Sequence, residues 1–292
     1  TQLYQSSVPR PSEQQQQQQE ASSWMNQPMK RQQQSRGGRK LFAVDNKLLE
    51  VADRTEISLG RLAMIVSIMV PCDEASWKAI LPLVEETGAD GIELNFGCPH
   101  GMSERGMGAA VGQVPEYIQM ATEWAKSAAK IPVIVKLTPN VASILPPAKA
   151  AMDGGADAVS LINTINSIMR VNYDTLTMYP TTDGMGTHGG YCGEAVKPIA
   201  LNMVAEIARN PGTHGLPISG IGGVTTWRDA AEFMALGAGN VQVCTAAMTY
   251  GFKVVQEMIS GLEQWMDEKG HGYIYPDYNY TKPYIFTKIE RK

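Results

Sequence analysis

Reactive and polar residues of this 292-residue sequence follow several apolar runs, at the points where those runs end. The run Gly91–Phe96 leads into Gly97-Cys98-Pro99-His100-Gly101-Met102, and Glu104-Arg105-Gly106-Met107-Gly108 follows closely. Cys98 therefore lies in a loop framed by glycine and proline, where a thiol could donate or accept a proton. Because cysteine is often a plain core residue, Cys98 alone does not decide the chemistry, and Cys72 and Cys192 are expected to be buried structural cysteines.

Amide and ammonium groups end two further runs. Lys136 closes the run Pro132–Leu137, where it could stabilise negative charge on a bound ring or form a Schiff base. The alternative for Lys136 is an ordinary lysine whose head reaches water from a strand edge. Asn95 and Asn163 each offer a donor and an acceptor, which complements the edge of a cyclic imide. Their alternative is the turn chemistry common at strand ends.

Glycines and small residues end the last two runs. Gly220-Ile221-Gly222-Gly223 follows one run, and Cys244-Thr245 follows the other. Glycine lets backbone N–H groups approach an anion without a Cβ in the way. Together the two loops are typical of the phosphate pocket between the last two units of a barrel, with an ordinary glycine turn as the alternative.

The elements that must position these residues alternate regularly from about Leu62 onward. The apolar runs are rich in Val and Ile, as strands buried on both faces are, and the stretches between them have helical spacing. The expected strands are Ala63–Val70, Gly91–Phe96, Pro132–Leu137, Ala158–Ile162, Leu216–Gly220 and Asn240–Val243. The expected helices are Glu74–Thr87, Pro115–Ala129, Ser143–Asp153, Val196–Asn210, Trp227–Leu236 and Gly251–Lys269.

This alternation predicts an α/β fold with a parallel sheet and right-handed crossovers. Three helices end in a similar phrase, at Gly88, Gly155 and Gly237, where glycine with positive φ stops a helix before the next strand. The repeated turn favours a (β/α)₈ TIM-barrel type. Because only six of the eight units of a barrel are recognisable, the barrel is expected to be incomplete. A doubly wound sheet also accommodates six strands, so the count alone does not choose.

Composition bounds the partners and the compartment. The net charge of −4 argues against a nucleic-acid binder, and no apolar run is long enough to span a membrane. The first ten residues lack the pattern of a signal peptide. The four cysteines form no C-x-x-C pair, so neither a zinc ribbon nor an iron–sulfur motif is expected, and no metal site is predicted. The expected location is a reducing cytoplasm.

The ends of the chain differ from its centre. Residues 1–40 contain an uninterrupted glutamine run, Gln14–Gln19, and are expected to be a disordered tail. A small basic cluster there, between residues 30 and 40, is interpreted as solvated rather than as a contact for an acidic partner. Residues 41–61 are an uncertain linker with a short helical pattern. The recognisable domain is 62–270, and 271–292 form a C-terminal tail.

The residues around Cys98 resemble the active-site loop of the dihydropyrimidine dehydrogenases. The sequence Asn95-Phe96-Gly97-Cys98-Pro99-His100-Gly101-Met102, followed by Glu104 to Gly108, looks most like the FMN-binding catalytic subunits of the bacterial NAD-dependent type. The wider dihydroorotate dehydrogenase family has a similar Cys-Pro loop but not the Pro-His-Gly-Met continuation, so it ranks second. The resemblance spans about Arg61 to Gly270.

The resemblance implies an FMN-carrying TIM barrel that reduces the 5,6 double bond of uracil or thymine, with NADH as the ultimate donor. Cys98 matches the general acid that protonates C5. The substrate-binding positions are Asn95, Gly97, Asn163 and Thr164. The FMN-binding positions are Lys136 beside the ring, Gly193, and a phosphate cradle of Ile221, Gly222, Gly223, Cys244 and Thr245. The segment Ile165–Gly190 matches a loop over the substrate, and at about 25 residues it is interpreted as a lid.

The sequence also departs from that family. Two earlier barrel strands have no recognisable counterpart, and the iron–sulfur ligands of the bacterial members are missing. The clusters and the NADH-oxidising flavoprotein would then belong to a partner subunit, and an oligomer is expected. Three alternatives remain: a dihydroorotate dehydrogenase-type enzyme, a truncated non-catalytic remnant with open barrel edges, and, more weakly, a Schiff-base aldolase using Lys136.

Overall fold

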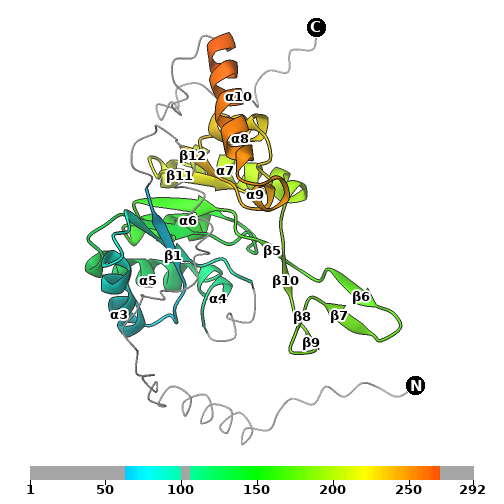
Figure 1. Ribbon diagram of the computed structural model, residues 1–292. Coiled ribbons are helices and arrows are strands. Elements are labelled where there is room, and N and C mark those ends of the chain that lie inside the picture. The colour runs from blue at the N-terminus through cyan, green and yellow to red at the C-terminus, as the bar shows by residue number, and fades with distance from the viewer. Residues whose placement is uncertain (1–62, 100–105, 270–292) are drawn as a thin grey trace, which may run out of the picture. The chain divides into compact units, whose positions relative to one another are not determined.

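The computed structural model describes residues 63–99 and 106–269 (Figure 1). The expectations for the glutamine-rich tail, the linker 41–61, its helical pattern, the basic cluster and the C-terminal tail therefore lie outside the described residues. So do His100 to Arg105 of the loop that follows Cys98.

A six-stranded parallel sheet forms the centre of the fold. Its strands are β1 (Ile65–Ile68), β2 (Gly91–Asn95), β3 (Val133–Lys136), β4 (Ala158–Leu161), β11 (Ile218–Ile221) and β12 (Asn240–Gln242). They pair in the order in which they follow one another in the chain, β1-β2-β3-β4-β11-β12. A doubly wound sheet would reverse its strand order at a switch point, whereas a barrel winds in one direction. The strand order therefore confirms the α/β barrel type. The barrel is incomplete in the described residues, because β1 and β12 each keep one unpaired edge there.

Helices fill the connections between neighbouring strands. They are α3 (Glu74–Glu85), α4 (Ala109–Gly112), α5 (Pro115–Ala128), α6 (Leu145–Asp153), α7 (Lys197–Arg209) and α8 (Trp227–Ala235). Two more helices, α9 (Thr245–Tyr250) and α10 (Lys253–Lys269), follow the last strand, β12. Short 3₁₀ turns, η2 (Glu194–Val196) and η3 (Pro211–Thr213), flank α7. Because parallel crossovers are right-handed and the strands run in chain order, the connecting helices share one face of the sheet. None of the described helices is long and apolar enough to cross a membrane.

Local sequence signals explain where several helices begin. Asp73 caps α3 by accepting a hydrogen bond from the backbone N–H of Ser76 at 2.8 Å. Thr226 and Asp229 form a reciprocal capping box at the start of α8. The expected glycine turns are also present, because φ is +80° at Gly88, +86° at Gly155 and +112° at Gly237.

The two faces of the sheet carry different residue types. On β2, Ile92 and Leu94 pack into the apolar layer shared with the helices, while Glu93 and Asn95 alternate to the opposite, inner face. The same alternation places Lys136, Ser160 and Gln242 on the inner face. Since barrel interiors are usually filled by branched apolar side chains, a polar inner layer is unusual.

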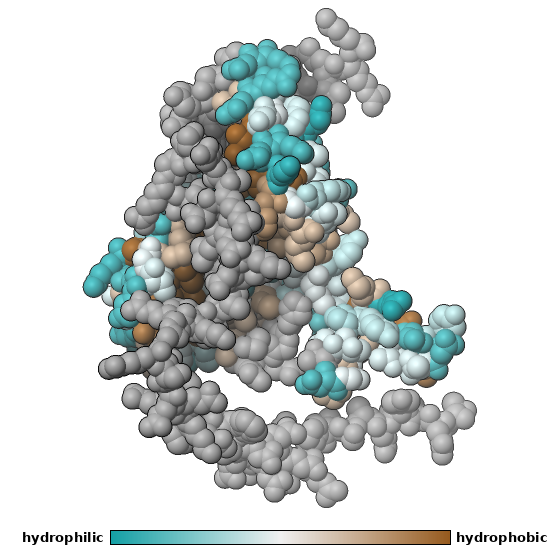
Figure 2. Space-filling view, in the orientation of Figure 1, coloured by the Kyte–Doolittle hydropathy of each residue, from teal (hydrophilic) through white to brown (hydrophobic). Residues whose placement is uncertain are grey.

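The segment predicted as a lid contains short strands that the sequence pattern did not reveal. β5 (Ile165–Ser167) pairs antiparallel with β10 (Gly189–Tyr191), and two hairpins lie between them. The hairpin strands are β6 (Arg170–Asn172) with β7 (Thr177–Tyr179), and β8 (Thr181–Thr182) with β9 (Met185–Gly186). Figure 1 shows the hairpins extending beyond the β5–β10 ladder, away from the six-stranded sheet. Met169 and Leu176 are exposed in this segment. Figure 2 shows hydrophobic and hydrophilic residues mixed on the surface of the hairpins.

Candidate functional site

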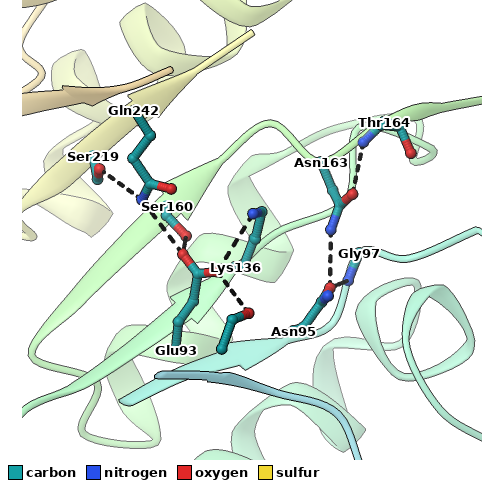
Figure 3. Close-up of polar contacts among 10 residues, drawn as sticks. Glu93, Asn95, Gly97, Lys136, Ser160, Asn163, Thr164, Ser219 and Gln242 are labelled. Atoms are coloured by element: carbon teal, nitrogen blue, oxygen red, sulfur yellow. Dashed lines mark hydrogen bonds and ion pairs between the residues drawn. The ribbon is translucent and has the colours of Figure 1, made fainter. Parts of the chain in front are cut away.

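The candidate site lies where the parallel strands end, because the carboxyl ends of such strands meet at one edge of the sheet. Asn95 ends β2 and Lys136 ends β3, and the two are direct neighbours in the sheet register. Asn163 and Thr164 follow β4 closely. The structure brings together Asn95, Gly97, Asn163 and Thr164, the four residues that the sequence analysis assigned to substrate binding (Figure 3).

Backbone groups fix the orientation of the two asparagine amides. Asn95 Oδ1 accepts hydrogen bonds from the Gly97 N–H at 3.1 Å and from Asn163 Nδ2 at 2.9 Å. Asn163 Oδ1 accepts from the Thr164 N–H at 2.8 Å. A backbone N–H can only donate, so both amide oxygens must point into the protein. The amide NH₂ group of Asn95 then points away from these partners, and the described residues supply no acceptor for it.

Gly97 permits the close approach of these two asparagines. A Cβ placed on Gly97 would lie 2.3 Å from the Asn163 Cβ and 2.5 Å from its Nδ2 atom. Real side-chain atoms do not come this close, so only glycine leaves room for Asn163. The role of Gly97 in this geometry is therefore to leave space for the Asn163 side chain that packs against it.

Thr164 connects the asparagine pair to the hairpin segment. Its Oγ1 is buried against Gly190 and has no hydrogen-bond partner among the described residues. Its carbonyl accepts from Asn140 Nδ2 at 3.1 Å, and Asn140 Oδ1 accepts from the Asn166 N–H at 2.8 Å. Asn140, which sequence reasoning did not select, thus anchors the base of the β5–β10 ladder to the loop after β3.

Cys98 lies beside this pair, one residue beyond Gly97, and is half-buried. Its carbonyl accepts from the Ala109 N–H at 3.0 Å, so the two ends of the loop that begins at Cys98 meet at α4. Gly108 has φ of +56° at that junction. The loop is therefore closed at its base, with Cys98 as its first residue.

A polar cluster on the inner face surrounds Glu93, a residue that sequence reasoning missed. Glu93 accepts from Ser67 Oγ at 2.9 Å and from Ser160 Oγ at 2.7 Å, and Lys136 Nζ lies 3.4 Å from its Oε1 atom. Gln242 Nε2 lies 3.4 Å from Oε2. The sequence does hold a signal, because Glu93 is a lone charge inside the otherwise apolar run Gly91–Leu94. Figure 3 shows Lys136 between this cluster and the asparagine pair.

Three segments converge near the predicted phosphate cradle. Gly222 and Gly223 have φ of +126° and +72°, and a Cβ on Gly223 would lie 3.0 Å from the Gly193 carbonyl oxygen. A Cβ on Gly193 would lie 3.7 Å from Thr245 Cγ2. The Ile221 side chain is buried, so only its backbone can face a ligand, whereas Cys244 is exposed. The loops that contain Gly193, Gly222–Gly223 and Thr245 therefore lie against one another.

The lysine next to these loops is already paired. Lys197 Nζ lies 2.6 Å from Asp229 Oδ1 and 2.8 Å from Glu232 Oε2, and the hydrogen bond that it donates to Asp229 is the largest cause of its raised pKa. Burial raises the pKa of Asp229, but hydrogen bonds from Lys197, Thr225 and its neighbour outweigh burial and hold that pKa well below its usual range. An anion here would therefore be bound by backbone groups rather than by Lys197.

The two cysteines expected to be buried differ from each other. Cys192 is exposed, so the prediction of a buried core cysteine was wrong. It comes directly after β10, outside the helix–sheet core, and its Sγ accepts from Thr245 Oγ1 at 3.4 Å. Cys72 is half-buried, and burial, followed by the nearby Asp73 carboxylate, raises the pKa of its thiol. Within residues 63–99 and 106–269, no group of three or more His, Cys, Asp or Glu side chains could hold a metal ion.

Comparison with curated proteins identifies similar dehydrogenase subunits. The chain is 42% identical over 207 residues to the NAD-dependent dihydropyrimidine dehydrogenase subunit PreA of Escherichia coli K12, which covers 71% of this chain and 50% of the relative. It is 41% identical over 208 residues to the chloroplastic dihydropyrimidine dehydrogenase (NADP(+)) of Arabidopsis thaliana, covering 70% and 49%. The chain thus spans about half the length of these relatives.

A further relative and a solved structure agree on the fold. The catalytic subunit of dihydroorotate dehydrogenase B (NAD(+)) from Thermococcus kodakarensis is 42% identical over 182 residues, covering 62% of this chain and 57% of the relative. The crystal structure of a ligand-free dihydroorotate dehydrogenase from Eimeria tenella superposes with a TM-score of 0.56 at 18% identity, over 77% of this chain and 66% of that one. The family model of dihydroorotate dehydrogenase matches residues 29–266. The chain therefore belongs to the dihydroorotate dehydrogenase family.

Proposed function

We propose that this chain is the flavin-binding part of a dehydrogenase that reduces the 5,6 double bond of uracil or thymine, with NADH as the ultimate electron donor. The observation that carries the proposal is the oriented asparagine pair beside Cys98. Asn95 presents donors to the site, and a pyrimidine-dione ring presents carbonyl acceptors at its edge. Sequence similarity to dihydropyrimidine dehydrogenases supports the same substrate class.

The residues present fit an FMN cofactor at two places. The loops of Gly193, Gly222–Gly223 and Thr245 lie against one another, and glycine there leaves backbone N–H groups uncovered by a Cβ, which suits a phosphate. Lys136, at the end of β3, suits the ring. Ile221 and Cys244 complete the cradle through their backbones. When bound, FMN supplies the hydride that the reaction needs.

The chain's own residues supply binding and a proton. Asn95 and Asn163 orient the pyrimidine, and the Thr164 backbone N–H holds the Asn163 amide oxygen in place. Gly97 keeps Asn163 in place. Cys98 donates the proton that C5 acquires, while C6 acquires the hydride, so the double bond gains one proton and one hydride. Lys136 places positive charge where the reacting rings gather electron density.

Electron supply is proposed to come from a partner subunit. An NADH-oxidising flavoprotein with iron–sulfur clusters would relay electrons to this chain, within an oligomer in the cytoplasm. The printed name of the Escherichia coli relative, a subunit, is in keeping with such an assembly.

The direct test is the substitution Cys98→Ala in the FMN-loaded protein. Loss of the acid should lower uracil turnover by about 10²–10⁴-fold while FMN stays bound, which visible absorbance would report. Cys72→Ala is a matched control, because Cys72 is also a half-buried cysteine but has no proposed role in the chemistry. Unchanged uracil reduction in Cys98→Ala would contradict the role of Cys98.

A second candidate, dihydroorotate oxidation, is favoured by the 42% identity to the Thermococcus kodakarensis subunit. Parallel assays with uracil, thymine and dihydroorotate would separate it from the first. Among the described strands, β1 and β12 each keep one unpaired edge, and this observation favours a third candidate, a non-catalytic remnant. Sedimentation combined with flavin stoichiometry tests it, since a monomer that binds no flavin is the result expected of a remnant.

A further inference from the structure

The inner face of the sheet holds one carboxylate that the proposed mechanism does not use. Glu93 lies in the middle of β2 and is only 4% exposed. Its partners come from four other strands: Ser67 on β1, Lys136 on β3, Ser160 on β4 and Gln242 on β12. One side chain thus links most of the sheet across its inner face.

Every partner of Glu93 is a donor. The hydroxyls of Ser67 and Ser160 and the amide of Gln242 point hydrogens at its two oxygens, and Lys136 adds an ammonium. This donor set matches an ionised carboxylate, which accepts at both oxygens and donates at neither. Gln242 is itself held by its second bond, to Ser219 Oγ at 3.0 Å. The carboxylate is therefore fixed on both sides.

Burial of the Glu93 carboxylate beside the Lys136 ammonium lowers the stability of the fold. Taking a carboxylate and an ammonium out of water costs several kcal/mol per ion, and well-packed apolar residues are often the more stable alternative. Barrel interiors normally use such apolar residues. The stability of the fold therefore does not account for the Glu93–Lys136 pair, whereas the position of Lys136 at the candidate site does.

Lys136 lies between the Glu93 cluster and the substrate-facing asparagines. Its Cα is paired with that of Asn95 in the sheet register, and its side chain is 21% exposed. A lysine stem has four rotatable carbons, so an ammonium at a strand end can adopt many positions. The Glu93 Oε1 atom, 3.4 Å away, restricts it to the inner face. Ser67 binds the same oxygen at 2.9 Å and so helps to hold it still.

We infer that Glu93 is a positioning residue that directs the Lys136 ammonium toward the bound flavin. Ser67, Ser160 and Gln242 keep the carboxylate in place, and Glu93 acts on the reaction through Lys136 alone. The inference rests on the proposed function, because it takes the flavin ring to lie beside Lys136. It adds to that function Glu93, a residue on the inner face of the sheet that determines where the Lys136 ammonium lies.

A double-mutant cycle with Glu93→Gln and Lys136→Met tests the inference. Glutamine keeps the shape of Glu93 and removes its charge. In the FMN-binding cycle, Glu93→Gln alone should weaken FMN binding by about tenfold, equivalent to 1.4 kcal/mol, and by less than about twofold when Lys136 is already Met. The reduction potential of bound FMN should likewise shift in Glu93→Gln and stay unchanged when Glu93→Gln is added to Lys136→Met. General loosening of the fold would not produce that dependence.

Thermal unfolding of the flavin-free protein is an independent test of the Glu93–Lys136 interaction. Glu93→Gln should lower the unfolding temperature of the parent, because it leaves Lys136 without its carboxylate. In Lys136→Met the same change should raise that temperature, because it removes an uncompensated buried charge. Asp153→Asn is the control, since it breaks an exposed lysine–carboxylate pair on α6 and should change neither FMN binding nor potential.

The outcomes are distinct. Equal effects of Glu93→Gln in both backgrounds, on FMN affinity and potential, would overturn the inference while leaving the proposed function intact. A parent protein that binds no FMN would contradict the proposed function, and the inference would fall with it. If Glu93→Gln does not fold, Ser67→Ala replaces it in the cycle, because it removes a donor from the same Oε1 atom. A Lys136-dependent shift in potential is then still required.

Discussion

The substitution Gly97→Ala would displace Asn163 without changing any polar group. The added Cβ would lie 2.3 Å from the Asn163 Cβ, 2.5 Å from its Nδ2 and 2.7 Å from its Cγ. Carbon atoms in contact prefer a separation of about 3.5–4.0 Å, so Asn163 or the backbone of Gly97 must move by roughly 1 Å. This shift weakens two hydrogen bonds of Asn163: the one that its Nδ2 donates to Asn95 Oδ1, and the one that its Oδ1 accepts from the Thr164 N–H.

The expected effect falls on the pyrimidine. A misplacement of about 1 Å can lower catalytic efficiency by about 10²-fold, and each weakened hydrogen bond contributes about 1 kcal/mol to stability. We therefore expect Gly97→Ala to lower kcat/KM for uracil by about 10–100-fold, to weaken equilibrium binding of uracil, and to leave FMN binding nearly unchanged. Steady-state kinetics and ligand titration of the FMN-loaded variant provide the measurements.

Gly88→Ala serves as the control for a general loss of stability. A Cβ on Gly88 meets no atom within 4 Å, so the change adds only the strain of its φ of +80°, about 1–2 kcal/mol. It should lower the unfolding temperature and leave uracil kinetics intact. If Gly97→Ala bound uracil as well as the parent, or if Gly88→Ala lost binding equally, the reasoning from the close approach of Asn163 would be refuted.

Three further changes have defined outcomes. Asn163→Asp places a carboxylate oxygen against Asn95 Oδ1, so uracil binding should weaken by at least about tenfold while flavin absorbance is kept, as titration would show. Asp229→Asn should lower the free energy of unfolding at neutral pH. Since the pKa of Asp229 is depressed on folding, the stability that its carboxylate contributes is present above about pH 4 and is lost as the pH falls further. Urea denaturation between pH 6 and 2 should therefore show the free energy of unfolding of the parent falling toward that of the variant. Gly220→Ala would bring a Cβ to 2.5 Å from the Phe233 ring, so the unfolding temperature should drop, with a loss of about 1–3 kcal/mol measurable by denaturant.

The strands of the sheet could be predicted because each is a short Val- and Ile-rich run bounded by glycine or a helix. The number of strands alone could not predict their order, since six parallel strands suit a barrel and a doubly wound sheet equally. The repeated glycine turn and the family resemblance favoured the barrel, and the strand order confirms it. Pairing in chain order is a long-range property that local periodicity does not encode. The hairpins within 165–191 were missed for a related reason, because strands of two or three residues are too short to show an alternating pattern.

The candidate site divides in the same way. Asn95, Gly97 and Asn163 could be selected because they follow strands directly, and the structure brings them together. Glu93 was missed although it is a lone charge in an apolar run, because its hydrogen-bond partners lie 26, 67 and 149 residues away in the sequence. Cys192 was assigned to the core on the general tendency of cysteine, which its place after β10 overrode.

The fixed amides have a consequence for selectivity among pyrimidines. Because backbone N–H groups set both oxygens, Asn95 cannot turn its amide to suit a different ligand without losing two hydrogen bonds. A ring with a carbonyl at that edge meets a preorganised donor and loses little entropy on binding. A ring with an exocyclic amine there, such as cytosine, would set donor against donor and leave a buried group unpaired, at a cost of about 1–3 kcal/mol. Discrimination by ring polarity would thus be in place before any ligand arrives.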